Sequence, residues 1–275
     1  MKTPFAGTTA IITGAASGIG KALSTELAKR GTTVVLADLQ VELAESIADA
    51  LRTAGGKAWA RQLDVTDFSA VKRLVDEVFD ECGRLDYIFN NAGIGIGGRA
   101  EDFAIEDWRK IIEVNLHGVV NGIQAAYGPM INQGFGHIVN TSSLAGVVPA
   151  PGNVAYSGTK FAVAGISQSL RIEAECHGVK VSVICPGPVD TPILGGGKYG
   201  KLAKGVTPQQ AVAYWKRFNP ADPEIFARKV INKVARNKAV IIEPPFGKWA
   251  FSYWIYRFSW HLWYWLARKM YTKMN

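Results

Sequence analysis

The chain has 275 residues, of which 48% are hydrophobic and 20% are charged, and these proportions exclude a disordered or collagen-like chain. They allow one large domain or two small ones, each with an ordinary apolar core. The net charge is +8, but residues 246–275 hold five basic and no acidic residues, so the rest of the chain is nearly balanced. Because the basic charge is confined to an aromatic terminal segment, we expect no nucleic-acid partner.

The cysteines and the N-terminus bear on the cellular compartment. Cys82, Cys176 and Cys185 have neither a paired spacing nor neighbours suited to hold a metal, which is typical of reduced thiols inside a cell. Residues 1–9 are too short and too polar for a signal peptide. We therefore expect a cytoplasmic protein without a metal site.

The first apolar run ends in a glycine-rich turn. Residues 9–13 are predicted to form a buried strand, the turn is Gly14-Ala-Ala-Ser17-Gly18-Ile19-Gly20, and residues 21–30 form an amphipathic helix that Gly31 stops. A strand, a glycine turn and a helix N-terminus together offer free N–H groups to an anion, which predicts a phosphate cradle. An ordinary turn is the alternative, because the spacing G-x-x-x-G-x-G differs from G-x-G-x-x-G.

Asp38 follows the second predicted strand, residues 32–37. An acidic residue about 20 positions after the glycines suits a hydrogen bond to the ribose 2′-hydroxyl of NAD and repels the 2′-phosphate of NADP. No Arg or Lys stands within the glycine turn or directly after Asp38 to offset that repulsion. The pattern favours NAD, with NADP as the alternative; Asp38 is also placed to cap the next helix, residues 41–54.

Strands and helices continue to alternate along the chain. Predicted strands cover residues 58–63, 86–89, 136–140, 179–185 and 238–243, and predicted helices cover 68–81, 105–130, 154–177, 208–217 and 221–237. Thr66 or Asp67 is expected to cap the helix at 68–81. This alternation predicts an α/β fold, a Rossmann-type doubly wound parallel sheet of about seven strands with helices on both faces. We expect one domain, residues 1–245.

Two polar features accompany these elements. Asn90-Asn91-Ala92-Gly93 follows a strand, at the sheet edge where ligands enter such folds. Asn115 lies inside the long predicted helix, where an Asn is mildly unfavourable. Asn115 therefore serves either a structural hydrogen bond or catalysis.

Tyr156 and Lys160 lie four residues apart on the helix at 154–177 and share one face, one turn apart. An ammonium beside a phenol favours the phenolate, so the pKa of Tyr156 is expected to fall from about 10 towards neutrality. Such a group moves a proton on or off an alcohol oxygen, and Ser143 is placed to donate a hydrogen bond to the same oxygen. The alternative is a surface pair without a role.

Together, these motifs resemble the classical branch of the short-chain dehydrogenase/reductase family. The resemblance covers about residues 5–245 and includes Thr13-Gly14-x-x-x-Gly18-Ile19-Gly20, Asp64, Asn90-Asn91-Ala92-Gly93, Asn115, Ser143, Tyr156-x-x-x-Lys160 and Pro186-Gly187. It implies a hydride transfer between a nicotinamide and a substrate carbinol carbon. It further implies that Tyr156 is the acid/base, Ser143 rather than Ser142 orients the substrate oxygen, Lys160 binds the nicotinamide ribose and lowers the pKa of Tyr156, and Asn115 holds a water in a proton relay.

The resemblance also implies the cofactor contacts and the oligomeric state. Gly14, Ser17, Gly18, Ile19 and Gly20 would cradle the pyrophosphate, Asp38 would bind the adenine ribose, Asp64 and Val65 the adenine, Asn91, Ala92 and Gly93 would flank the cofactor, and Pro186, Gly187, Val189 and Thr191 would close over the nicotinamide. We expect a homodimer or homotetramer in which the helices at 105–130 and 154–177 pair across a two-fold axis.

Residues 246–275 depart from the family pattern, because such enzymes commonly end shortly after the last strand. The segment holds five of the eight tryptophans, and if it is one helix, Arg257, His261 and Arg268 share one stripe. Charges near its middle make a membrane-spanning helix costly, whereas Trp, Tyr and basic residues suit a bilayer surface. We expect a peripheral membrane anchor; packing on its own domain or on a partner subunit is the alternative.

The substrate is the least determined part of the function. Residues 193–220 are expected to form a substrate lid, and its aromatic residues, with Val147 and Val148 near the active-site entrance, favour an apolar substrate. The predicted function is an NAD-dependent oxidoreductase of a hydrophobic secondary alcohol or ketone of the steroid, retinoid or long-chain type. The alternatives are a soluble NADP-dependent carbonyl or 3-oxoacyl reductase, and a nucleotide-binding scaffold without turnover.

Overall fold

The computed structural model describes residues 4–244 and 248–272. One sheet of seven parallel strands runs through it in the order β3-β2-β1-β4-β5-β6-β7. The strands are β1 (Thr9–Thr13), β2 (Thr33–Asp38), β3 (Lys57–Gln62), β4 (Tyr87–Asn90), β5 (Gly136–Thr141), β6 (Val179–Pro186) and β7 (Val240–Glu243). The order reverses direction at β1, so the crevice between the carboxyl ends of β1 and β4 is the place where such sheets bind ligands.

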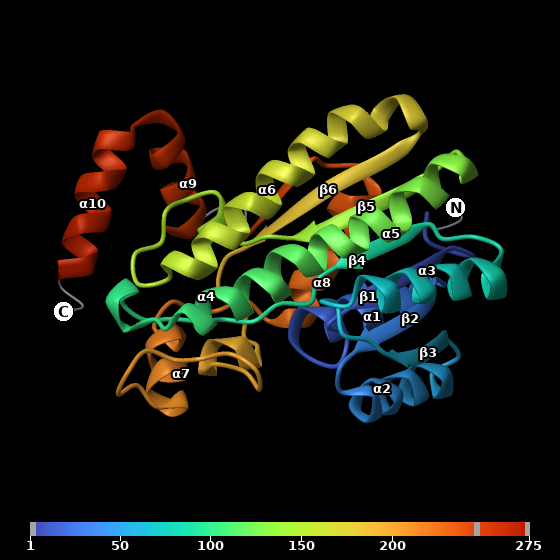
Figure 1. Cartoon of the computed structure of the whole chain (residues 1–275), viewed down its shortest axis with the longest axis horizontal. Helices are drawn as coiled ribbons and strands as arrows, with labels where there is room; N and C mark the ends of the chain where they lie inside the picture. The colour runs from blue at the N-terminus through green and yellow to red at the C-terminus, as the bar shows by residue number, and fades with distance from the viewer. Residues whose placement is uncertain (1–3, 245–247, 273–275) are drawn as a thin grey trace.

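Helices cover both faces of the sheet (Figure 1). They are α1 (Gly18–Lys29), α2 (Val41–Thr53), α3 (Phe68–Cys82), α4 (Ile105–Ile112), α5 (Gly118–Gln133), α6 (Val154–Ala174), α7 (Pro208–Lys216), α8 (Pro223–Ala235), α9 (Lys248–Phe258) and α10 (Trp260–Thr272). On β1, Ala10 and Ile12 pack with α1, α2 and α8, whereas Ile11 packs with α3, α5 and α6. This alternation buries the strand on both faces and confirms the predicted doubly wound fold.

The long helix predicted over 105–130 is interrupted. Between α4 and α5 the backbone forms a π-helical turn, Glu113–His117, and α5 then continues to Gln133, where Gly134 adopts a left-handed conformation with φ +81°. A π turn accommodates one extra residue within a helix, often at a functional position. Asn115 lies in this turn and is fully buried. The other predicted elements differ from the observed bounds by three residues or fewer.

The C-terminal segment forms the predicted helical extension, but as two helices, so the condition of one continuous helix is not met. The break falls at Ser259, whose hydroxyl accepts a hydrogen bond from the Leu262 N–H at 3.3 Å and so caps α10. Arg257 and His261 consequently lie on different helices, and no single stripe joins them to Arg268. Residues 245–247 and 273–275 of the predicted extension lie outside the described residues. No helix in the described part of the chain is long and apolar enough to cross a bilayer.

Helices α9 and α10 lie at one end of the molecule, beside the loop that joins β5 to α6 (Figure 1). Trp263 and Ala267 of α10 are each 7% exposed and pack against Leu144 and Val148 of that loop. The tail therefore packs on its own domain with one face, directly beside the segment that follows Ser143.

Candidate active site

Tyr156 and Lys160 lie near the start of α6, on one face of the helix as their spacing predicts. The Lys160 ammonium nitrogen is 5.6 Å from the centroid of the Tyr156 ring, and it donates a hydrogen bond of 2.9 Å to the Thr141 carbonyl at the end of β5. Lys160 is 3% exposed, whereas Tyr156 is half-buried. The pair is part of the interior, so the alternative of a surface pair is wrong.

The two serines after β5 differ in their surroundings. Ser142 is 1% exposed, and its hydroxyl donates to the Lys160 carbonyl at 2.7 Å. Ser143 is half-buried, its oxygen accepts from the Ala145 N–H at 3.1 Å, and its side chain lies close enough to the Tyr156 phenol to lower the pKa of that group. Only Ser143 is thus positioned beside the phenol, whereas Ser142 holds the backbone of α6 in place.

The expected fall in the pKa of Tyr156 is not found. Burial raises the pKa of the Tyr156 phenol above its ordinary value of 10.0, and the hydrogen bond from Ser143 only partly opposes that rise. Burial also lowers the pKa of Lys160 from 10.5 to about 8. The two side chains are both withdrawn from water, and for both the neutral form gains from this withdrawal. An ammonium 5.6 Å from the ring centroid does not outweigh it.

The oxygen and the nitrogen of the Asn115 side-chain amide both form hydrogen bonds with the backbone of one neighbour, Ile94. Its oxygen accepts from the Ile94 N–H at 2.8 Å, and its nitrogen donates to the Ile94 carbonyl at 2.9 Å. A Cβ on Gly93 would lie 3.2 Å from that amide oxygen and 3.5 Å from the Lys160 nitrogen. Asn115 therefore fixes the Gly93–Ile94 backbone against Lys160. Its role in a proton relay stays a prediction.

The glycine turn is built for close approach of backbone. Gly14 has φ +66°, and a Cβ there would lie 2.8 Å from the Ala92 Cα atom. A Cβ on Gly20 would lie 2.1 Å from the Gly14 carbonyl oxygen, so no other residue fits. Ser17, the residue before α1, makes no side-chain capping bond, and no acidic residue stands in the first turn. The N-terminal N–H groups of α1 are thus presented to an external anion.

Asp38 joins this turn at the end of β2. It is 9% exposed, and one carboxylate oxygen accepts from the Ala16 N–H at 2.9 Å while the other accepts from the Gln40 N–H at 2.9 Å. Gln40 is the residue that precedes α2, so Asp38 lies outside the capping position. The carboxylate is therefore held at the glycine turn, where the ribose of a bound dinucleotide would lie.

The strand after Asp38 leads to the predicted adenine contacts. Asp64 accepts hydrogen bonds from the N–H and hydroxyl groups of Thr66 at 2.9 and 2.7 Å, and Asn121 of α5 donates to the Val65 carbonyl at 2.8 Å. Asp67 caps α3, as one of the two predicted residues. Asp64 and Val65 are therefore fixed at the same sheet edge as Asp38, after β3, which β2 and β1 separate from β4.

Thr13 links the glycine turn to the segment after β4, a role that the sequence analysis did not give to this first residue of the glycine motif. Its hydroxyl oxygen accepts from the N–H groups of Asn91 and Ala92, both at 3.0 Å, and its carbonyl accepts from the Asn91 amide at 3.0 Å. Thr141, which holds Lys160, was missed. Both residues end a strand at the edge where the site lies, and that position is the signal that identifies them.

The predicted nicotinamide contacts cross the same edge. Pro186 ends β6, the Gly187 N–H donates to the Glu243 carbonyl at 2.9 Å, and Val189 is 3% exposed in the core. A Cβ on Gly18 would lie 3.1 Å from the side chain of Thr191. Thr191 is thereby placed over the glycine turn, on the far side of the crevice from Lys160.

A cleft of about 260 Å³ lies between these segments. The glycine turn, the start of α2, the Gly93–Gly95 backbone and residues 192–200 line it. Lys201 holds the last segment closed, because its ammonium contacts the Asp107 carboxylate at 2.5 Å and its backbone pairs with Gly95 and Gly97. The start of the predicted lid, residues 193–220, therefore lines the crevice, and its action as a lid stays a prediction.

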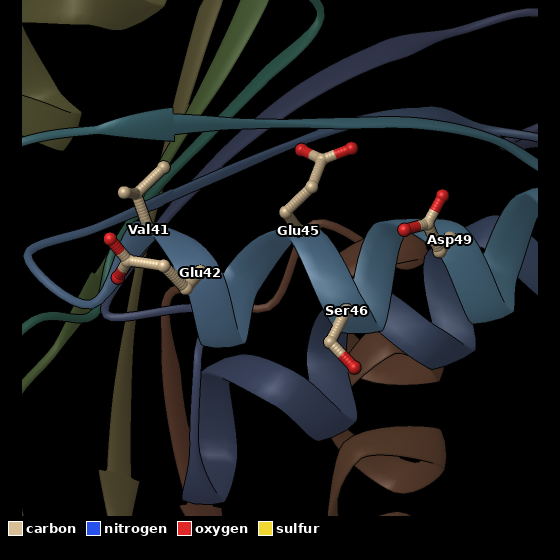
Figure 2. A pocket seen from close by; sticks show the side chains of 5 residues that line it. All are labelled: Val41, Glu42, Glu45, Ser46 and Asp49. Atoms are coloured by element: carbon tan, nitrogen blue, oxygen red, sulfur yellow. The ribbon is translucent and has the colours of Figure 1, made fainter.

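A second hollow, of about 560 Å³, lies along one side of α2 and is lined by Val41, Glu42, Glu45, Ser46 and Asp49 (Figure 2). None of the predicted site residues lines it. Glu45 and Asp49 bind the Arg52 guanidinium at 2.6 and 2.5 Å. This hollow is an open helix side with its own ion pairs rather than a catalytic site.

The residues present fit a nicotinamide dinucleotide. The turn leaves no room for side chains at Gly14 and Gly20, the start of α1 presents N–H groups, and a buried carboxylate stands where a ribose would lie. Tyr156, Ser143 and Lys160 come together beside Gly93, which lines the cleft. Such an arrangement can hold a dinucleotide along the cleft and move a proton beside it.

Comparison with known proteins agrees with this geometry. A family model for short chain dehydrogenase matches residues 8–198. The 2,5-dichloro-2,5-cyclohexadiene-1,4-diol dehydrogenase LinX of Sphingobium indicum is 39% identical over 193 residues, which are 70% of this chain and 77% of that protein.

Solved structures show the same fold. A short chain dehydrogenase/reductase from Burkholderia phymatum in complex with NAD superposes with a TM-score of 0.79 at 28% identity, over 88% of this chain and 91% of that one. An alcohol dehydrogenase from Thermococcus sibiricus complexed with 5-hydroxy-NADP gives a TM-score of 0.72 at 28% identity, over 86% and 94% of the two chains. The chain belongs to the short-chain dehydrogenase/reductase family, whose members are oxidoreductases that act on CH–OH groups with NAD or NADP.

Proposed function

We propose that this protein is an NAD-dependent oxidoreductase that interconverts a hydrophobic secondary alcohol and its ketone. The observation that carries the proposal is the buried Asp38 carboxylate, bound to the glycine turn through the Ala16 N–H. A 2′-phosphate placed there would meet a negative charge in a region of low dielectric, which opposes its binding. A ribose 2′-hydroxyl would instead donate a hydrogen bond to the same oxygen atoms.

The apolar surroundings of Tyr156 support the hydrophobic substrate. Tyr156 packs in one cluster with Ile94 and Ile96 from the segment after β4, Phe103 and Trp108 near α4, and Tyr199 from the lid. A substrate carbon that approaches the phenol therefore contacts apolar side chains. Burial of such a substrate contributes about 0.8 kcal/mol for each CH₂ group removed from water. The relative LinX is named for a substrate with two secondary hydroxyl groups on a chlorinated carbon ring.

The chain's own residues handle the proton. NAD, when bound, supplies the hydride acceptor. In its deprotonated form Tyr156 takes the hydroxyl proton of the alcohol, and Ser143 holds the same oxygen through a second hydrogen bond. The burial that raises the pKa of Tyr156 favours the protonated phenol, which is the form that donates a proton. Lys160 is positioned by Thr141 beside the phenol, and Asn115 keeps Gly93 within reach of Lys160. In the direction of ketone reduction, Tyr156 returns the proton.

The proposal is tested by the ratio of kcat/KM for NAD⁺ over NADP⁺, measured with secondary alcohols of increasing apolar length. We expect the wild type to prefer NAD⁺ at least a hundredfold and to gain with chain length. Asp38→Asn removes the charge and is expected to lower the cofactor ratio at least tenfold. Asp67→Asn, at the cap of α3, is the matched control and leaves the ratio unchanged.

The same assay separates the alternatives. Preference of the wild type for NADP⁺ would contradict the role of Asp38 and favour the reductase of carbonyl or 3-oxoacyl substrates. Tyr156→Phe is expected to abolish turnover while NAD⁺ binding, measured by calorimetry, stays within about twofold. Wild-type NAD⁺ binding without turnover on any alcohol or ketone would favour a scaffold.

A further inference from the structure

We propose that α9 and α10 bind the surface of an anionic phospholipid membrane. These two helices, residues 248–272, are called the aromatic hairpin below. Its outer face exposes large apolar side chains by 47–80%: Phe251, Trp254, Phe258, Trp260, Leu262, Tyr264 and Trp265. Aromatic side chains bury about 150–250 Å² each, so this face offers on the order of several hundred Å². That is as large as the largest apolar patch of a typical monomer, which commonly marks an interaction site.

The rings of this face pack on one another and form a preformed surface. Trp254 stacks on Phe258 at 5.8 Å with an interplanar angle of 13°. A second row crosses the break at Ser259, from Tyr256 to Trp260 at 6.0 Å and on to Tyr264 at 5.9 Å. Because the rings are already held, little side-chain entropy is lost when they meet a partner.

One face of the aromatic hairpin is covered by the chain's own domain, so a partner would contact the exposed remainder of the hairpin. Trp263 and Ala267 are buried against Leu144 and Val148, and Ser252 of α9 is 9% exposed. The hairpin is thus anchored to its own domain by one face. The large apolar side chains named above are exposed on the rest of its surface.

The charges of the aromatic hairpin decide the kind of partner. Arg257, Arg268 and Lys269 are exposed, and residues 246–275 contain no acidic side chain. The Lys269 nitrogen lies 3.8 Å from the centroid of the Trp265 ring, so a cation and an aromatic ring share one spot of the surface. Indole and phenol rings beside basic groups match the boundary between lipid headgroups and acyl chains, where phosphates are near.

A second copy of the chain fits this face less well. In a two-fold symmetric contact the same patch meets itself, so the basic side chains of Arg257, Arg268 and Lys269 would meet a second hairpin that contains no acidic side chain. Bringing like charges together opposes such a contact. An anionic lipid surface instead attracts all three charges, with about 1 kcal/mol for each near the surface.

The length of the helices places them in the surface rather than across the bilayer. α9 has 11 residues and α10 has 13, which correspond to lengths of roughly 16 and 20 Å. Both are shorter than the hydrocarbon core of about 30 Å. The hairpin therefore lies flat, with the rings inserted and the basic groups at the phosphates. This proposal does not depend on the cofactor or on the substrate.

The test is co-sedimentation of the full chain with vesicles of phosphatidylcholine, with and without phosphatidylglycerol. We expect binding to the vesicles that contain phosphatidylglycerol and little binding to phosphatidylcholine alone. The triple variant Trp254→Ser, Phe258→Ser, Trp260→Ser is expected to bind more than tenfold more weakly. The triple variant Arg257→Gln, Arg268→Gln, Lys269→Gln is expected to lose on the order of a hundredfold in affinity.

Matched controls keep the test specific. Phe68, Ile172 and Ile225 are exposed by 46%, 77% and 45% on helices outside the hairpin, so the variant Phe68→Ser, Ile172→Ser, Ile225→Ser removes similar exposed apolar groups. It is expected to bind like the wild type, and thermal unfolding confirms that each variant is folded. Absence of binding to phosphatidylglycerol vesicles, or equal loss in the control, would overturn the proposal. A dimer seen by sedimentation velocity that only the aromatic variant dissociates, without vesicle binding, would assign the face to a second copy.

Discussion

Adjacent serines at the end of β5 have different neighbours, and this difference separates catalysis from structure at the scale of single residues. The Ser142 hydroxyl is bound to the Lys160 carbonyl, whereas the Ser143 side chain reaches the Tyr156 phenol. The motif spacing selected Ser143 by resemblance alone. The hydrogen bonds supply the physical reason. A hydroxyl has one hydrogen, and Ser142 already donates it to the backbone, so Ser142 cannot donate it to a substrate oxygen.

Substitution of each serine separates the two roles. Ser143→Ala is expected to lower kcat at least a hundredfold with little change in unfolding free energy, because it removes a donor aimed at the reacting oxygen. Ser142→Ala leaves the Lys160 carbonyl without that donor and is expected to cost about 1–3 kcal/mol of stability. Turnover and urea unfolding of both variants provide the check. Equal losses of kcat would contradict the assignment.

Lys160, a predicted catalytic residue, lowers the free energy of unfolding of the chain while it is charged. Its pKa of about 8 in the folded chain, against 10.5 for an ordinary Lys, means that the unfolded chain binds more protons between these pH values. Unfolding free energy therefore rises with pH through this window as far as Lys160 contributes. Below pH 8 the full penalty is present, on the order of 3 kcal/mol.

Lys160→Met keeps the buried volume and removes the charge. At pH 7 we expect the variant to unfold with a higher free energy than the wild type, reduced by about 1 kcal/mol for the lost hydrogen bond to Thr141. The advantage is expected to shrink between pH 8 and 10.5, and turnover is expected to be lost. Urea unfolding of the wild type and the variant at pH 7 and at pH 10.5 measures the difference in unfolding free energy. A variant that is less stable at pH 7 would show that the ammonium is not penalised by burial.

At the scale of elements, the sequence predicted the order of strands and helices because apolar runs and glycines mark them directly. It did not predict the π turn at Asn115, since one extra residue in a helix leaves the apolar spacing almost unchanged. The cap at Ser259 was hidden in the same way within a continuous run of aromatic residues. The raised pKa of Tyr156 depends on burial in the folded chain, which no local pattern records.

The π turn and the segment after β4 are expected to act as one unit. Asn115→Ala leaves the buried N–H and carbonyl groups of Ile94 without these partners, which costs about 1–3 kcal/mol. Because Gly93 then shifts, KM for NAD⁺ is expected to rise more than tenfold. Gln133 makes the same pair of bonds to the Leu85 backbone, so Gln133→Ala is the matched control. It is expected to lose similar stability without a change in KM; a similar rise in KM for both variants would assign Asn115 a general structural role.

At the scale of the whole molecule, the cofactor cleft joins two halves of the chain. The glycine turn and α2 form one wall, and residues 192–200 form the other. A dinucleotide that contacts both walls raises the free energy of unfolding, by an amount that grows with the logarithm of its concentration divided by its Kd. Resemblance to a family predicted the glycine turn and Gly93 but not the lining by α2 and residues 192–200, and only the fold shows that Lys201, next to that segment, binds Asp107 of α4.

Thermal unfolding with nucleotides measures this linkage. NAD⁺ at a hundred times its Kd is expected to stabilise the chain by about 2.7 kcal/mol and raise Tm by several degrees. NADP⁺ at the same concentration is expected to raise Tm less, because of Asp38. AMP, which lacks the nicotinamide half, is expected to act only through the first wall. If AMP raised Tm as much as NAD⁺ at equal concentration, residues 192–200 would not contact the cofactor.

The strand order has a consequence for biosynthesis. β1 lies in the sheet between β2 and β4, and later strands add outward as far as β7, so the sheet grows in the order in which the ribosome releases the chain. The half that contains the glycine turn and Asp38 is complete before Tyr156 has been made. The aromatic hairpin emerges after β5 and the loop that follows it, against which Trp263 and Ala267 pack. The exposed aromatic side chains of the hairpin therefore leave the ribosome when the surface that supports the hairpin has already been made.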